Sequence, residues 1–246
     1  MAGRSYTTEA VVLRSFRLGE ADRVLHLYTL ERGRVNAIAK GVRKTGSRFG
    51  ARLEPLTRSA LILHEGRGEL HTVSGADIIS SQEQVRADGY ALAVGQIGAE
   101  AVLKLFAEPE PNPRAYEGLC RFLELLAEPL ERASDPQHDG LGLAFQLKLL
   151  ALSGYLPHLD SCASCGTAGP LAGFSAAAGG AVCTGCMVAS GGFRMADGAI
   201  AAIEGLLERP LAPVALLPEA AAGALRVVEE TYAHHGGFRL RTLQPS

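Results

Sequence analysis

The sequence predicts an α+β protein with three parts: a small N-terminal β-barrel, a helical bundle, and an insert organised by four cysteines. Three observations predict this class. Short alternating apolar segments fill the first eighty residues, longer apolar stretches with helical spacing follow, and two Cys-x-x-Cys pairs interrupt those stretches. We expect the barrel over 1–80, the helical domain over 81–158 and 193–246, and the cysteine element over 159–192.

Five N-terminal segments have the composition of strands bounded by turn residues. Gly19 and Gly33 lie in two of the turns, where glycine adopts a positive φ at little cost. Five short strands in about seventy residues match the size of an OB-fold barrel, and an SH3-like barrel competes on strand count. The expected strands are 8–17, 24–30, 34–39, 57–64 and 69–79.

Residues 40–52, between the third and fourth expected strands, hold five cations, three glycines and Phe49. Few apolar residues are available to hold this segment against a core, so we expect a mobile loop with an exposed Phe49.

Helical periodicity begins after the barrel. Ser81 is expected to cap a helix that starts near Gln82. Residues 90–106 are apolar on nearly all sides, which predicts a buried central helix. Cys120 lies on the apolar face of the next helix and is expected to be a buried small hydrophobic residue. The expected helices are 90–106, 114–128, 141–152, 197–208 and 219–234.

The four remaining cysteines form two Cys-x-x-Cys pairs separated by seventeen residues, a spacing typical of a tetrahedral Cys₄ zinc site. The intervening residues are rich in glycine and poor in large apolar side chains, so a structural Zn²⁺ would supply free energy that the segment lacks. Disulfides, free thiols or a redox Cys-x-x-Cys are the alternatives. The proposed ligands are Cys162, Cys165, Cys183 and Cys186.

Charge is divided unevenly along the chain. Residues 1–60 hold twelve Lys or Arg against five acids, whereas the whole chain has a net charge of −2. A positively charged barrel favours a polyanionic partner, and arginine binds phosphate in a bidentate manner. Phe16, Tyr28 or Phe49 could stack on bases.

The candidate DNA-binding residues lie either on the expected strands or on the loop at 40–52. An ordinary solvated surface is the alternative, with Arg23 paired to Asp22 and Arg34 paired to Glu31. The candidates are Arg14, Arg17, Arg23, Arg34, Lys40, Arg43, Lys44, Arg48 and Arg52.

Signatures of other classes are missing from the sequence. It has no GxxxxGK[ST], GxSxG or HExxH motif and no catalytic site that we can assign, so we expect a protein that is not an enzyme. It has no run of about eighteen apolar residues and no secretory signal, so we expect a cytoplasmic protein, and DNA binding would make it nucleoid-associated.

Several N-terminal segments resemble the RecO recombination-mediator family, and the order of helices and cysteine pairs that follows is similar to that family over essentially the whole chain. The matching segments are TEAVVL at 8–13, GEADRVL at 19–25, LYT at 27–29 with Gly33, AKGVRK at 39–44, and LEP at 53–55.

The resemblance implies an OB-fold at the N-terminus, a helical domain and a Cys₄ zinc-ribbon-like insert. It implies binding of single- and double-stranded DNA and annealing of complementary strands. It also implies partnership with RecR, handling of the single-stranded-DNA-binding protein (SSB), and help in loading RecA. The Lys40–Lys44 motif is the part that the resemblance assigns to DNA contact. A zinc-stabilised interaction scaffold or transcription-type adaptor without DNA binding is the alternative function, and a nuclease or thiol oxidoreductase is a more distant one.

Overall fold

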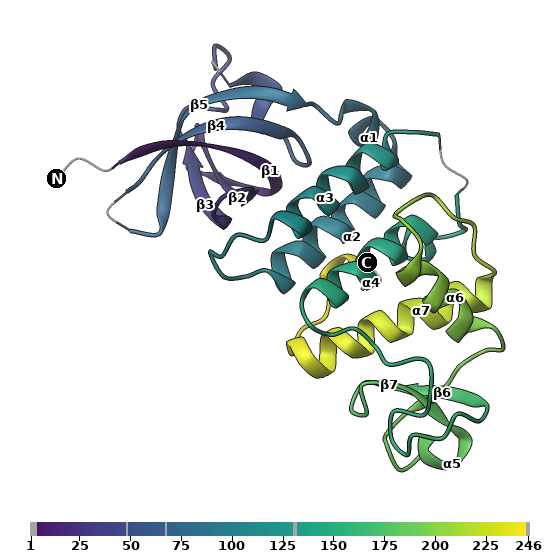
Figure 1. Cartoon of the computed structure of the whole chain (residues 1–246). Helices are drawn as coiled ribbons and strands as arrows, with labels where there is room; N and C mark the ends of the chain where they lie inside the picture. The colour runs from purple at the N-terminus through teal and green to yellow at the C-terminus, as the bar shows by residue number, and fades with distance from the viewer. Residues whose placement is uncertain (1–3, 48, 67, 130–131, 245–246) are drawn as a thin grey trace. The chain divides into compact units, whose positions relative to one another are not determined.

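The computed structural model describes residues 4–47, 49–66, 68–129 and 132–244 (Figure 1). The chain divides into two compact units, Met1–Ala127 and Glu128–Ser246. The finer three-part division expected from the sequence stays a prediction. Among the described residues, no helix combines the length and apolar character needed to cross a membrane.

The first unit contains a closed five-stranded barrel with strand order β1-β2-β3-β5-β4 (Figure 1). The β3–β5 pair is parallel and the other pairs are antiparallel, which is the OB-fold arrangement and decides against the SH3-like alternative. All five expected strands are confirmed to within three residues. They are β1 (Ser5–Leu18), β2 (Asp22–Thr29), β3 (Gly33–Ala39), β4 (Arg58–His64) and β5 (Leu70–Ser80).

Alternate side chains of these strands fill the barrel, as in Leu25 and Leu27 of β2. Phe49 and Leu53 join the same core. The expected exposure of Phe49 was therefore wrong, because Phe49 is only 2% exposed, whereas residues 40–47 form a loop as expected. The short 3₁₀ helix Gly50–Leu53 directs Leu53 inward, so this end of the 40–52 segment is anchored in the core.

Three helices complete the first unit: α1 (Glu83–Ala87), α2 (Gly89–Leu105) and α3 (Pro113–Leu126). Asp88 caps α2 by accepting hydrogen bonds from two backbone N–H groups, and Asn112 caps α3 by accepting one from the backbone N–H of Ala115. The expected Ser81 cap was wrong, since Gln82 takes that position with φ of 53° and makes no side-chain cap. Cys120 is buried on α3, as expected.

The connection between α2 and α3 packs against the start of β3 at Gly33. A Cβ atom on Gly33 would lie 2.0 Å from the carbonyl oxygen of Glu110, and Gly33 has a φ of +61°. Only glycine satisfies both the close approach and the backbone conformation.

Gly33→Ala should therefore lower the free energy of unfolding by about 3 kcal/mol or more, since left-handed strain and a backbone clash add together. Gly19→Ala is the control, because Gly19 has a φ of +57° and open space around it. That change should cost about 1 kcal/mol. Urea denaturation of both variants measures the difference, and equal losses would contradict the packing argument.

The second unit is built from helices and a small sheet. Helices α4, α6 and α7 pack on one another, and the expected helices in this region are confirmed. The sheet has strand order β7-β6-β8. The elements are α4 (Gly140–Leu152), β6 (Leu171–Ser175), β7 (Gly180–Cys183), α5 (Thr184–Met187), β8 (Phe193–Arg194), α6 (Ala199–Glu208) and α7 (Pro218–Thr231), followed by a π-helical turn (Tyr232–Gly236).

Candidate nucleic-acid interface and metal centre

Cations and aromatic rings meet on the outer face of β1, β2 and β3. Strand pairing places Arg14 opposite His26, and His26 opposite Asn36. The guanidinium carbon of Arg14 lies 4.6 Å from the ring centroid of Phe16, whose centroid is 5.3 Å from that of His26. Nη2 of Arg34 lies 3.5 Å from Nδ1 of His26. These four residues form a continuous group, which we call the sheet-face row: Arg14, Phe16, His26 and Arg34.

Electrostatics make the sheet-face row suitable for an anionic polymer. Burial lowers the pKa of His26, and the positive charges of Arg34 and Arg14 lower it further. The imidazole is therefore neutral at neutral pH, and its Nδ1 can accept a hydrogen bond from Arg34. Two guanidinium groups flank this neutral ring, while Phe16 is 40% exposed beside them. Guanidinium groups bind phosphates, and an exposed ring can stack on a base.

The 40–52 segment carries a second group of cations. The backbone N–H of Arg43 donates to the carbonyl oxygen of Ala21, and its guanidinium donates to the carbonyl oxygens of Gly19 and Glu20 at 3.3 and 2.8 Å. Arg43 thus ties this segment to the β1–β2 turn. Lys40 and Lys44 are exposed on the same segment.

The remaining candidates have different surroundings. Arg17 and Arg23 lie opposite each other in the β1–β2 pair, one position out of phase with Phe16. Arg23 forms an ion pair with Glu54 at 3.3 Å, so its suggested pairing with Asp22 was wrong.

Asp22 instead accepts a hydrogen bond from the backbone of Gly41. Arg52 donates to the carbonyl oxygen of Phe49 at 3.4 Å. Arg48 lies outside the described residues.

The contacts of Arg34 also differ from the suggested ion pair with Glu31. Its guanidinium contacts His26 and the carbonyl oxygen of Ala107, while Glu31 accepts from the hydroxyl of Thr8. The suggested pairing of Arg34 with Glu31 was therefore wrong.

Two of the three aromatic residues suggested for base stacking are not available. Tyr28 is fully buried, with its ring centroid 5.8 Å from that of Phe106, and Phe49 belongs to the barrel core. Phe16 remains. His26 was missed from the sequence, because its place between two arginines depends on strand register.

Phe16→Ala should weaken binding of single-stranded DNA about tenfold, since stacking is worth roughly 1–3 kcal/mol per base. The free energy of unfolding should change little, because the ring is exposed. Phe49→Ala is the contrasting variant and should cost about 3–5 kcal/mol of stability. Fluorescence anisotropy with a labelled oligonucleotide and thermal unfolding provide the two measurements. Wild-type affinity in Phe16→Ala would remove the stacking role.

The second unit brings its four paired cysteines together. Cys162 and Cys165 come from the turn before β6, whereas Cys183 and Cys186 come from the end of β7 and from α5. Their sulfur atoms all lie within 4.8 Å of one another. The Cys165 and Cys183 sulfurs are 4.0 Å apart, close to the separation of about 3.8 Å that tetrahedral Zn–S bonds of about 2.3 Å produce. The four residues could therefore hold a metal ion.

Hydrogen bonds favour the thiolate form of two of these cysteines, Cys162 and Cys165. The backbone N–H of Cys183 lies 3.4 Å from the Cys162 sulfur, and this contact is the main cause that lowers the pKa of Cys162 to about 6. The hydroxyl of Thr167 lowers the pKa of Cys165. Interaction with the Cys165 sulfur raises the pKa of Cys186 to about 12. Four thiolates at these distances would repel one another, so all four cysteines can be ionised together only when a bound cation neutralises them.

Comparison with known proteins identifies the family. Residues 1–82 match the family model "Recombination protein O N terminal", and residues 86–244 match "Recombination protein O C terminal". The chain belongs to the RecO family. The RecO N-terminal match ends two residues after β5, so it covers the barrel, and the C-terminal match covers α2 to α7 with the cysteine cluster.

Curated relatives agree with the RecO assignment. A protein named "DNA repair protein RecO" from Rubrobacter xylanophilus is 38% identical over 219 residues, covering 85% of this chain and 84% of the relative. A protein of the same name from Frankia casuarinae is 44% identical over 182 residues, covering 74% and 73%. Another from Pelotomaculum thermopropionicum is 39% identical over 219 residues, covering 86% and 80%.

Proposed function

We propose that this chain is a recombination mediator that acts without making or breaking covalent bonds. It binds single- and double-stranded DNA, anneals complementary strands, and acts with RecR to help load RecA on SSB-coated DNA in the cytoplasm, at the nucleoid. Membership of the RecO family supports this role. The observation that carries DNA binding is the sheet-face row, in which two guanidinium groups flank Phe16 and His26.

Annealing follows from charge neutralisation. Two DNA strands repel each other, and each carries condensed counterions. Arginines and lysines that bind phosphates lower the repulsion and release these ions, which salt opposes. Phosphate contacts leave most base edges free to pair with the complementary strand. Two of these cations also make structural contacts, because Arg23 pairs with Glu54 and Arg43 ties the 40–52 segment to the β1–β2 turn. The cations that we assign to this role are Arg14, Arg17, Arg23, Arg34, Lys40, Arg43, Lys44, Arg48 and Arg52.

We further propose that the four-cysteine cluster holds one structural Zn²⁺. Four thiolate ligands complete a tetrahedral shell, which is typical of structural rather than catalytic zinc. Cys162, Cys165, Cys183 and Cys186 would bind it, and the bound ion would hold the turn before β6 to the end of β7.

A fluorescence strand-annealing assay across a salt series tests the main proposal. We expect faster pairing of complementary oligonucleotides in the presence of the protein, with an effect that declines as salt increases. A gel-shift with a short oligonucleotide separates this function from the interaction-scaffold alternative. Absence of both annealing and a shift at low salt would leave the scaffold as the better account.

A further inference from the structure

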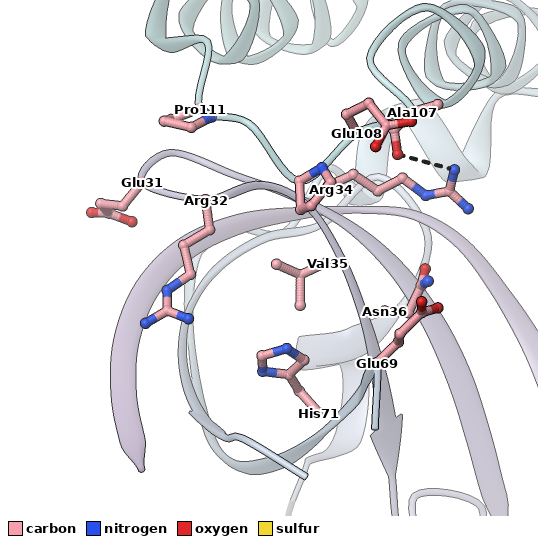
Figure 2. A pocket seen from close by; sticks show the side chains of 11 residues that line it. Glu31, Arg32, Arg34, Val35, Asn36, Glu69, His71, Ala107, Glu108 and Pro111 are labelled. Carbon is pink, nitrogen blue, oxygen red and sulfur yellow. Dashed lines mark hydrogen bonds between the residues drawn. The ribbon is translucent and has the colours of Figure 1, made fainter. Parts of the chain in front are cut away.

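A pocket of about 610 Å³ opens beside β3 and the start of β5, bounded also by the connection between α2 and α3 (Figure 2). This volume is within the range of small-molecule sites. Arg34 connects the pocket to the sheet-face row, because the same guanidinium contacts His26 and the carbonyl oxygen of Ala107. The pocket is therefore continuous with the surface that we assign to DNA.

Two polar atoms in the pocket lining lack partners. Nε of Arg34 and Oδ1 of Asn36 are both buried, and neither has a hydrogen-bond partner among the described residues. A buried donor or acceptor without a partner is costly, and one explanation is a ligand that supplies the partner. The two residues are neighbours on one face of β3, and their Cα atoms lie about 6.6 Å apart along the strand. The pocket thus offers one free donor and one free acceptor from the same strand face.

The charges of the lining disfavour phosphate. Glu31, Glu69 and Glu108 outnumber Arg32 and Arg34. Arg32 is moreover occupied elsewhere, since it pairs with Glu65 at 2.7 Å and its guanidinium carbon lies 3.7 Å from the centroid of the Tyr6 ring. A phosphate would meet more carboxylates than free cations, whereas a neutral group with N–H donors would find acceptors.

Some of the lining residues carry rings. Figure 2 shows His71 projecting into the pocket and Pro111 at its rim. Burial lowers the pKa of His71, so its imidazole is neutral at neutral pH and presents an uncharged ring. Glu69, which directly precedes β5, also lines the pocket, so the lining offers a carboxylate as a second acceptor for an amine.

We propose that the pocket receives an unpaired base that carries an exocyclic amine (cytosine, adenine or guanine) from the bound single strand. Each of these bases presents the amine beside a ring nitrogen that accepts, and these two groups can pair with Oδ1 of Asn36 and Nε of Arg34. Thymine has no exocyclic amine. This inference rests on the proposed DNA binding, and it adds a preference among bases to that function.

The test compares affinities for oligo(dC) and oligo(dT) of equal length, measured by fluorescence anisotropy at mildly alkaline pH. Wild-type protein should bind oligo(dC) about tenfold more tightly. Asn36→Ala should abolish that preference while leaving the oligo(dT) affinity unchanged. Its thermal unfolding midpoint should also stay unchanged, because Oδ1 has no partner to lose. Arg14→Ala is the control for phosphate contact and should weaken both oligomers equally.

Equal wild-type affinity for the two oligomers would overturn the pocket proposal and leave DNA binding intact. So would a preference for oligo(dC) that persists in Asn36→Ala. Failure of the wild-type protein to bind either oligomer would overturn the proposed function, and the base pocket with it.

Discussion

Cys162→Ser is expected to abolish metal binding and to unfold the small sheet β6–β8 while the barrel stays folded. Cys162 is 1% exposed, and its sulfur is one of four within 4.8 Å of one another. Structural zinc contributes about 10–16 kcal/mol in small peptide sites, and only a few large apolar side chains of the surrounding segment, such as Phe174 and Val182, are buried. Metal analysis should give about one Zn²⁺ per wild-type chain and substantially less in the variant.

The control for this experiment is Cys120→Ala, which removes a buried cysteine of α3 that lies outside the cluster. It should keep its metal. Hydrogen exchange should show faster exchange across 160–192 in Cys162→Ser alone. Freshly purified, reduced wild-type protein without metal would refute the zinc assignment.

Lys40→Glu combined with Lys44→Glu is expected to weaken single-strand binding about 100-fold at low salt and to slow annealing. Both lysines are exposed on the segment that follows β3. Reversing them removes two cations and adds two anions, so phosphates are repelled where they were attracted. The salt dependence should also become shallower, by about 0.7 in logarithmic slope for each phosphate that the protein no longer neutralises. Arg43 is left in place because its guanidinium holds the carbonyl oxygens of the β1–β2 turn.

The matched control reverses Arg114 and Arg121, which are exposed on α3. It changes the net charge by the same amount outside the barrel. If both double variants lose affinity equally, long-range charge rather than local contact explains the effect. If the lysine variant binds and anneals like the wild type, the 40–52 segment has no part in DNA contact. Unfolding curves of both variants should match the wild type.

Much of the fold was predictable because it depends on local pattern. Alternation along β1–β5 identified the strands, since every second side chain enters the barrel core. Helical spacing identified α2, α3, α4, α6 and α7. The spacing of Cys162, Cys165, Cys183 and Cys186 predicted their cluster, because two Cys-x-x-Cys turns can each direct two sulfurs to one point.

The surface of the barrel was less predictable. Phe49 looked like a loop residue among cations, but it fills the core after the chain turns back through Gly50–Leu53. Tyr28 lies on an outward-facing position of β2 and is nevertheless fully buried. Neither fact is encoded in neighbouring residues, since both depend on segments distant in the chain.

The sequence by itself determined the barrel strands, the helices, the positive charge of the N-terminal part and the cysteine cluster, because periodicity, composition and short spacing are local properties. Only the tertiary structure decided which cations act together. The register of β1, β2 and β3 sets Arg14, Phe16, His26 and Arg34 side by side. A bulge between Val12 and Arg14 shifts the register of β1 against β2 and so decides which β1 residue lies opposite His26. The pocket beside Asn36 likewise exists only because β5 and the α2–α3 connection reach β3 from elsewhere in the chain.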